Sequence, residues 1–378
     1  VNYQNFLEMP ISLVPAELFG GNPGEFSELT FGTEQNMIGS LKVEQLIFDG
    51  SYLVGLEASR VYLSISENLF EKTHIETKKL ITTLYSDVLL AKYNILFLEK
   101  NKASLEDNFQ EIHQLFRNGF EEEESVEQIQ LTLAQTNNRL KYGKNLLKIQ
   151  ENMLKFVIGY PIAVPLELTD ELDDIFNEGL YFQSLPATDN IDNNIDIRIA
   201  DSNVKAETLL LKLEKSKALP KVNAFMNRTY TGNSNEFTFT DGNQKWYGSS
   251  LLGLNVKIPI FSSLGRNAST QKAKISLDQA KTQLEETQTK IRIEVNAARN
   301  KYQLAVDNYY TEKENLRLAE SIEQKNQTRF YEGMVQSFEL RMAQMQLYTA
   351  QSNFVAAIQK VITNKIALES LLNQSNTN

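Results

Sequence analysis

The chain has 378 residues, a formal net charge of −10 and no cysteine. The acidic balance argues against a nucleic-acid partner, and the lack of thiols excludes disulfides, thiol catalysis and cysteine-ligated zinc. Charged residues make up 23% and hydrophobic residues 42% of the chain, which is typical of a folded protein rather than a disordered one.

Residues 1–49 are predicted to form a first pair of strands. The opening stretch VNYQNFLEMPI alternates apolar and polar side chains, and so does the stretch around Leu41 and Val43. Alternation with period two is typical of strands that have one apolar face. A polar loop, residues 12–33, is expected to connect the two strands at their outer end.

Residues 50–159 are predicted to form a long helical hairpin. This stretch contains no proline, which costs about 3 kcal/mol inside a helix. Its one obvious break is LFRNGFEEEES, where Gly119 supplies a residue suited to ending a helix. We expect a helix of roughly 65 residues, a tip turn near 117–124 and a return helix of roughly 35 residues. At 1.5 Å rise per residue, the longer helix would span about 95 Å.

Residues 160–189 connect the two halves of the chain. They carry four acidic side chains, for which we expect an equatorial surface patch, with helix capping as the alternative: Asp170, Glu171, Asp173 and Asp174. A helix over 190–218 is then expected to lead into the second half.

The second half repeats this order of elements. Residues 219–261 are predicted to form a second strand pair with an outer loop at 232–245. Residues 262–378 are predicted to form a second long helical hairpin, with a tip turn near 331–337 around Gly333.

A constant shift relates the two halves. Leu41 matches Leu254, and the shift of 254 − 41 = 213 also holds for Val43 with Val256 and Ile47 with Ile260. The turn glycines differ by 333 − 119 = 214. The sequence therefore predicts a tandem repeat. Because only the second strand pair is preceded by a helix, the repeat also predicts roughly 30 or more further residues upstream of Val1.

Strands of about ten residues with one apolar and one polar face are typical of membrane β-barrels with a wet lumen. Four strands are too few to close a barrel, since about eight are needed even for a filled one. Open sheet edges are not tolerated in lipid, so several copies would have to share one barrel. The alternative is a soluble sandwich that packs one face of the sheet on a core.

Five motifs, in order, resemble the TolC-like outer-membrane efflux protein family. They are LIFDGSYLVGLEASR and IPIFSSLGRNASTQKA at the strand-to-helix junctions, FRNGF and FYEGM at the hairpin tips, and ALPKVNAFMN before the second strand pair. The end of the first return helix, MLKFVIGYP, adds a further match.

The resemblance implies an α+β membrane protein in two structural repeats. Three copies, with four strands each, would share a 12-strand β-barrel in the outer-membrane lipid and continue into a long periplasmic α-helical barrel. Such proteins are passive exit ducts of tripartite efflux or type I secretion systems for small molecules, metals or proteins. They dock to an inner-membrane transporter through a periplasmic adaptor. The alternative is a soluble periplasmic coiled-coil tether or adaptor with a small β domain.

The resemblance also implies candidate site residues. The tip turns would dock the adaptor through Asn118, Gly119, Phe120, Glu332, Gly333 and Met334. Candidates for a tip constriction are Glu121, Glu124, Glu127 and Glu339. The simpler interpretations are that the glycines only end helices, and that the acidic run 121–124 is a solvated helix start favoured by the helix dipole.

We expect no catalytic residues, cofactor or metal. The chain shows no paired acid and base, nucleophile elbow, phosphate loop or metal-ligand spacing. The two histidines, His74 and His113, lie 39 residues apart in one predicted helix and are expected to be ordinary surface residues. The sequence contains no run of about 20 apolar residues, so it predicts no membrane-spanning helix.

Overall fold

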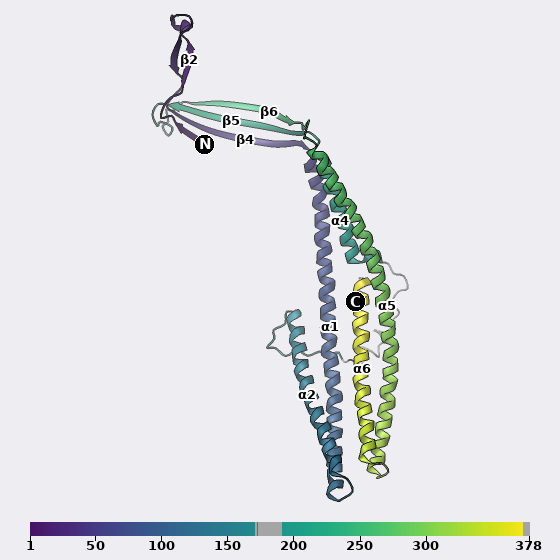
Figure 1. Ribbon diagram of the computed structural model, residues 1–378. Coiled ribbons are helices and arrows are strands. Elements are labelled where there is room, and N and C mark those ends of the chain that lie inside the picture. The colour runs from purple at the N-terminus through teal and green to yellow at the C-terminus, as the bar shows by residue number, and fades with distance from the viewer. Residues whose placement is uncertain (171, 173–190, 373–378) are drawn as a thin grey trace. The chain divides into compact units, whose positions relative to one another are not determined.

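The computed structural model describes residues 1–170, 172 and 191–372 (Figure 1). Contacts divide the chain into two compact units. One comprises Val1–Tyr62 and Lys205–Asp278, and the other Leu63–Val204 and Gln279–Asn378. The expected acidic residues Glu171, Asp173 and Asp174 lie outside the described residues.

The first unit contains a four-stranded antiparallel sheet in the order β1-β4-β5-β6. Its strands are β1 (Asn2–Asn5), β4 (Gln35–Asp49), β5 (Lys221–Ser234) and β6 (Trp246–Lys257). β4 and β5 come from opposite halves of the chain, yet they pair from Gln35↔Ser234 to Asp49↔Lys221. The two predicted strand pairs therefore join into one sheet.

The register aligns the predicted faces across the strands. Val43, Met226 and Leu252 lie directly opposite one another on β4, β5 and β6. Lys42 and Asn227 are paired on the other face. The apolar face is bare, since Leu252 is 78% exposed. Within the described residues no second sheet covers this face, so the layer that a soluble sandwich requires is missing.

The structure differs from expectation in the stretch 12–33. β2 (Ile11–Pro15) pairs with β3 (Phe26–Thr30) in a separate two-stranded sheet, joined through a short 3-10 helix at Ala16–Phe19. These strands are five residues long and lie between proline and glycine residues, so the sequence pattern did not distinguish them from a loop.

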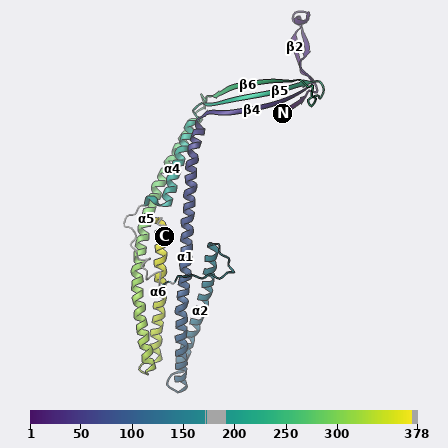
Figure 2. The same ribbon diagram turned by 180° about the vertical axis from the view of Figure 1, so that it is seen from behind.

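Both proline-free stretches are helical, as predicted. α1 (Gly50–Arg117) has 68 residues and α2 (Glu123–Val157) has 35. α5 (Gly265–Tyr331) has 67 and α6 (Ser337–Leu372) has 36. The remaining long helix is α4 (Ile195–Ser216), which follows a 3-10 turn at Ile191–Asn193. In both views α2 lies alongside α1, and α6 lies alongside α5 (Figure 1, Figure 2).

The helices are too polar to be membrane spans. Among the described residues, none of them contains an apolar stretch long enough to cross a bilayer.

The junction between β4 and α1 is fixed by Asp49. Its carboxylate accepts a hydrogen bond from the Ser51 amide at 2.8 Å and pairs with Lys221 of the neighbouring strand at 2.7 Å. Gly50 follows because a Cβ there would lie 2.6 Å from Leu219 Cδ1 and 3.3 Å from the Ser216 carbonyl oxygen. The glycine thus lets the end of α4 approach the start of α1.

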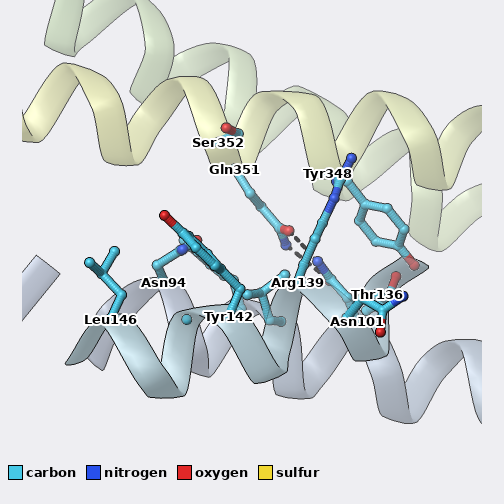
Figure 3. A pocket seen from close by; sticks show the side chains of 13 residues that line it. Asn94, Asn101, Thr136, Arg139, Tyr142, Leu146, Tyr348, Gln351 and Ser352 are labelled. Atoms are coloured by element: carbon cyan, nitrogen blue, oxygen red, sulfur yellow. Dashed lines mark hydrogen bonds between the residues drawn. The ribbon is translucent and has the colours of Figure 1, made fainter. Parts of the chain in front are cut away.

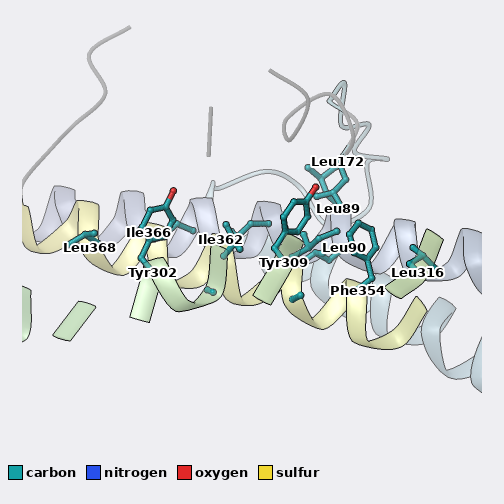
Figure 4. Close-up of a cluster of buried hydrophobic side chains, with 14 of the residues drawn as sticks. Leu89, Leu90, Leu172, Tyr302, Tyr309, Leu316, Phe354, Ile362, Ile366 and Leu368 are labelled. Atoms are coloured by element: carbon teal, nitrogen blue, oxygen red, sulfur yellow. The ribbon is translucent and has the colours of Figure 1, made fainter. Parts of the chain in front are cut away.

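Three apolar clusters hold the second unit together. The largest joins α1, α5 and α6 around Leu90, Tyr309 and Phe354 (Figure 4). A second cluster lies near the hairpin turns, and a third joins α1 and α2 around Val88 and Leu154. The helices are therefore packed in pairs and the pairs are packed on each other.

Candidate functional site at the helical-hairpin turns

The first hairpin turn has the geometry of a Schellman motif. α1 ends at Arg117, and Gly119 takes a positive φ of 80°. The Gly119 amide donates to the Phe116 carbonyl and the Phe120 amide donates to the Leu115 carbonyl, both at 2.9 Å. These two bonds satisfy the last carbonyl groups of the helix, and only glycine adopts the required backbone conformation without strain.

The second turn repeats this geometry. Gly333 has φ 70°, and its amide donates to the Phe330 carbonyl at 3.0 Å. The Met334 amide donates to the Arg329 carbonyl at 2.8 Å. The two turns are therefore built alike.

A third helix end shows that the glycine alone is not a site. Gly159 ends α2 with φ 71°, and the Tyr160 amide donates to the Lys155 carbonyl at 2.7 Å. The same motif thus ends a helix outside the two hairpin turns. What sets the hairpin turns apart is the side chain that follows the glycine.

Each hairpin turn presents an apolar side chain to solvent. Phe120 is 79% exposed and Met334 is 66% exposed. Asn118 and Glu332, which precede the glycines, are also exposed. In the single chain these apolar side chains do not pack over the turns, so they are available to a partner.

The two turns are held together by a buried cluster. Leu105 and Ile112 of α1, Ile129 of α2, Phe330 of α5 and Leu340 of α6 form it. Beside this cluster the Ser125 and Ser337 hydroxyls lie 3.2 Å apart, joining the first turns of α2 and α6. The turns therefore form one structural element.

The acidic candidates have mixed surroundings. The Glu124 carboxylate accepts a hydrogen bond from Gln128 at 2.6 Å, within its own helix. The Glu339 carboxylate accepts a bond from the Gln336 backbone amide at 3.1 Å and so caps the start of α6. Glu121 is half-buried and Glu127 is exposed. Its capping bond alone accounts for the position of Glu339. Within the described residues, Glu127 makes no such capping bond.

A buried polar layer next to this cluster was not predicted. Asn101 of α1 donates to Gln351 of α6 at 2.6 Å, and both residues are buried. Tyr331 donates to the fully buried Asn108 at 3.0 Å. Burial also raises the pKa of Glu323 on α5. The sequence did contain a signal for this layer: its polar residues occupy positions where the apolar stripe of a helix would otherwise continue.

One connector residue also has a defined contact. Asp170 accepts a hydrogen bond from the Tyr85 hydroxyl at 2.6 Å. Groups of three or more metal-ligating side chains do not occur in the part of the chain that the structure describes.

The sequence comparison decides the family. Residues 188–374 match the sequence model of the family described as outer membrane efflux protein. The chain belongs to the outer membrane efflux protein family. Membership makes it an efflux protein of the outer membrane rather than a soluble periplasmic tether. No curated protein sequence matches the chain.

Solved structures show the same fold over nearly the whole chain. CusC, whose structures concern folding and transmembrane channel formation, matches with a TM-score of 0.77 and 17% identity, over 98% of this chain and 82% of CusC. The outer membrane protein VceC of Vibrio cholerae matches with a TM-score of 0.72 and 14% identity, over 99% of this chain and 87% of VceC. The CmeC outer membrane channel of Campylobacter jejuni matches with a TM-score of 0.71 and 16% identity, over 98% of this chain and 77% of CmeC. The fold of the family therefore extends over the first half as well.

Proposed function

We propose that the chain is one subunit of a homotrimeric, passive exit duct. Three copies would close a 12-strand barrel in the outer membrane, and their long helices would continue it as a periplasmic tunnel. The main support for this proposal is that, within the described part of the chain, the edge of the sheet at β6 is unpaired. Over its 12 residues β6 pairs with β5 alone among the described strands. Unpaired backbone groups are not tolerated in lipid, so a strand of a second copy must cover this edge.

The helices support lateral assembly. Apolar side chains on α2 recur at intervals of three and four residues and are exposed: Tyr142 at 70%, Leu146 at 36%, Ile149 at 56%, Met153 at 53% and Phe156 at 78%. A stripe with this spacing is typical of a helix that packs on another helix. A neighbouring copy in the proposed tunnel would cover it.

The matching lengths of the two helical hairpins support the proposed tandem repeat. The helices have 68 and 35 residues in one half and 67 and 36 in the other. Equal lengths would let all helices of a trimer end at the same level, which is what a tunnel with a single narrow end requires.

The hairpin turns would dock a periplasmic adaptor, which in turn binds an inner-membrane transporter. The exposed Phe120 and Met334 support this role, because isolated apolar tips on rigid turns suit a protein partner. The energy for export would come from the transporter. The duct itself needs no catalytic residue or cofactor, and its cargo would be small molecules, metals or proteins.

The acidic residues near the turns would form a constriction. Threefold symmetry would bring copies of Glu121, Glu124, Glu127 and Glu339 together, and like charges in a narrow pore favour cations. Planar-bilayer recordings test this. We expect a cation-selective pore with divalent block that Glu339→Gln weakens and Glu236→Gln in the outer loop does not. An anion-selective pore would contradict an acidic constriction.

The assembly is tested by solubility and mass. A duct should require detergent for extraction and should elute with the mass of three copies when light scattering is corrected for detergent. A protein that is soluble after cell lysis, or a folded monomer in detergent, would contradict the proposal.

A further inference from the structure

Two adjoining cavities lie where α2 faces α1 and α6. The first, of about 510 Å³, is bounded by all three helices (Figure 3). The second, of about 490 Å³, lies between α2 and α6. Four residues line both: Thr136, Arg139, Tyr348 and Ser352. Together these cavities are called the α2–α6 seam, and each has a volume suited to a small ligand.

The seam is positively charged in an acidic protein. Arg139 and Arg341 both line the second cavity, and no aspartate or glutamate lines either one. Neither arginine forms an ion pair with any residue that the structure describes. Arg139 reaches from α2 toward α6 (Figure 3), and Arg341 lies over the Phe338 ring at 5.6 Å. Two uncompensated guanidinium groups thus face one space.

Two buried donors in the seam lack partners. The Tyr348 hydroxyl and Nη1 of Arg341 are buried and have no hydrogen-bond partner within the described residues. Burial raises the pKa of Tyr348, so its hydroxyl keeps its proton and remains a donor. Glu323 acts on Tyr348 from α5 but does not line either cavity. Buried donors are normally satisfied, so these two call for an acceptor from outside the chain.

We propose that the α2–α6 seam binds a ligand carrying two carboxylates. One carboxylate would accept hydrogen bonds from Arg341 and Tyr348, and the other would pair with Arg139. Guanidinium groups bind carboxylates through two parallel bonds, which explains why arginine rather than lysine occupies both positions. The carboxylates belong either to a small dicarboxylate or to acidic side chains of a protein segment. This site needs neither the barrel nor the tip, although Tyr142, which lines its first cavity, also belongs to the α2 stripe that a neighbouring copy would cover.

Calorimetry on the purified full chain in detergent tests the proposal. Succinate is the small probe, and succinamide, which has the same carbon frame but no charge, is its control. A short glutamate-rich peptide is the second probe. We expect saturable binding of succinate or the peptide and none of succinamide. Tighter binding of the peptide would assign the carboxylates to a protein, and tighter binding of succinate would assign them to a small ligand.

Four variants locate the binding. Arg139→Ala and Arg341→Ala should each weaken the affinity about 10- to 100-fold, as expected for loss of a charge-assisted bond. Arg341→Lys keeps the charge but loses the paired geometry, so it should weaken binding by about tenfold even where the alanine variant unfolds. Arg292→Ala, an exposed arginine on α5, is the matched control and should change nothing.

Two results would overturn the proposal. One is the absence of saturable binding by both probes. The other is binding that all three seam variants leave unchanged. Either result would leave the trimer and its conductance untouched, so the failure of this site is distinguishable from the failure of the duct.

Discussion

Asn101 on α1 and Gln351 on α6 exchange a pair of side-chain hydrogen bonds, at 2.6 Å and 3.4 Å, in the buried space between the two helical hairpins. Both amides are removed from water, so each depends on the other for its hydrogen bonds. The pair fixes the register of α1 against α6, because a shift of one helix along the other would leave both amides unpaired.

This pairing predicts an asymmetry between single and double variants. Asn101→Leu strands the buried Gln351 amide and should lower the free energy of unfolding by about 1–3 kcal/mol. Adding Gln351→Leu removes the stranded group, so the double variant should be more stable than the single one. Thermal unfolding followed by circular dichroism measures both. A double variant with the full sum of two single losses would show that the amides act independently.

Glu323 predicts a pH-dependent stability. Burial raises its pKa above the ordinary value of 4.5, so the folded protein binds this proton more tightly than the unfolded chain does. The free energy of unfolding should therefore fall as the pH rises from about 4.5 through the raised folded-state pKa, and stay level above it. Glu323→Gln should remove this pH dependence. Relative to the unaltered chain, the variant should therefore gain stability as the pH rises through the same range. Glu320→Gln, at an exposed position of α5, should leave the profile unchanged. Identical profiles for Glu323→Gln and the unaltered chain would contradict the assignment.

Replacing a turn glycine should lower the stability of the fold only through the backbone conformation. A Cβ at Gly119 or Gly333 meets nothing within 4 Å, yet both residues have positive φ. Alanine at Gly333 should therefore cost about 1–2 kcal/mol through the left-handed backbone alone. Asparagine, which tolerates this conformation, should cost less. Denaturant unfolding of the two variants distinguishes them, and equal losses would indicate a packing effect instead.

Substitution of Phe120 or Met334 should weaken adaptor docking without lowering the stability of the fold. Both side chains are exposed, so Phe120→Ser and Met334→Ser should change the free energy of unfolding by less than about 0.5 kcal/mol. Both should weaken capture of the periplasmic adaptor by several-fold if the turns are its docking site. Leu18→Ser, at an exposed position in the stretch 12–33, is a control that should leave adaptor capture intact. Unchanged capture by both turn variants would move the adaptor site elsewhere.

Much of the fold was predictable because it follows from local signals. The missing prolines predicted the long helices, and the glycines in LFRNGF and RFYEGM predicted where they end. Alternation predicted β4, β5 and β6, and the structure adds that β4 pairs with β5 across the two halves. This pairing joins residues about 200 apart, and periodicity carries no information about which strands meet.

Other features were not predictable from the same signals. The hairpin β2–β3 is too short to produce a clear periodic pattern. Asn101 and Gln351 each interrupt an apolar helical stripe, but neither sequence segment indicates that the two residues meet. Only the packing of α1 on α6 pairs them. The α2–α6 seam brings together Arg139 and Arg341, although α4, β5, β6 and α5 lie between them in the sequence. Long-range packing therefore decides the parts that local patterns leave open.

A shared barrel requires the open edge of β6 to pair with β1 of a second copy, since β1 and β6 are the two edges of the sheet. The chain has no cysteine, so introduced pairs report without background. Gln4→Cys on β1 is combined with one cysteine at a time at each position of β6, residues 246–257. Disulfide-linked dimers and trimers should form only for a few β6 positions close to Gln4 of the second copy. These positions should be every second residue, because alternate side chains point to opposite faces of the sheet. Cross-links at no position, in a protein that is a folded monomer in detergent, would contradict the shared barrel.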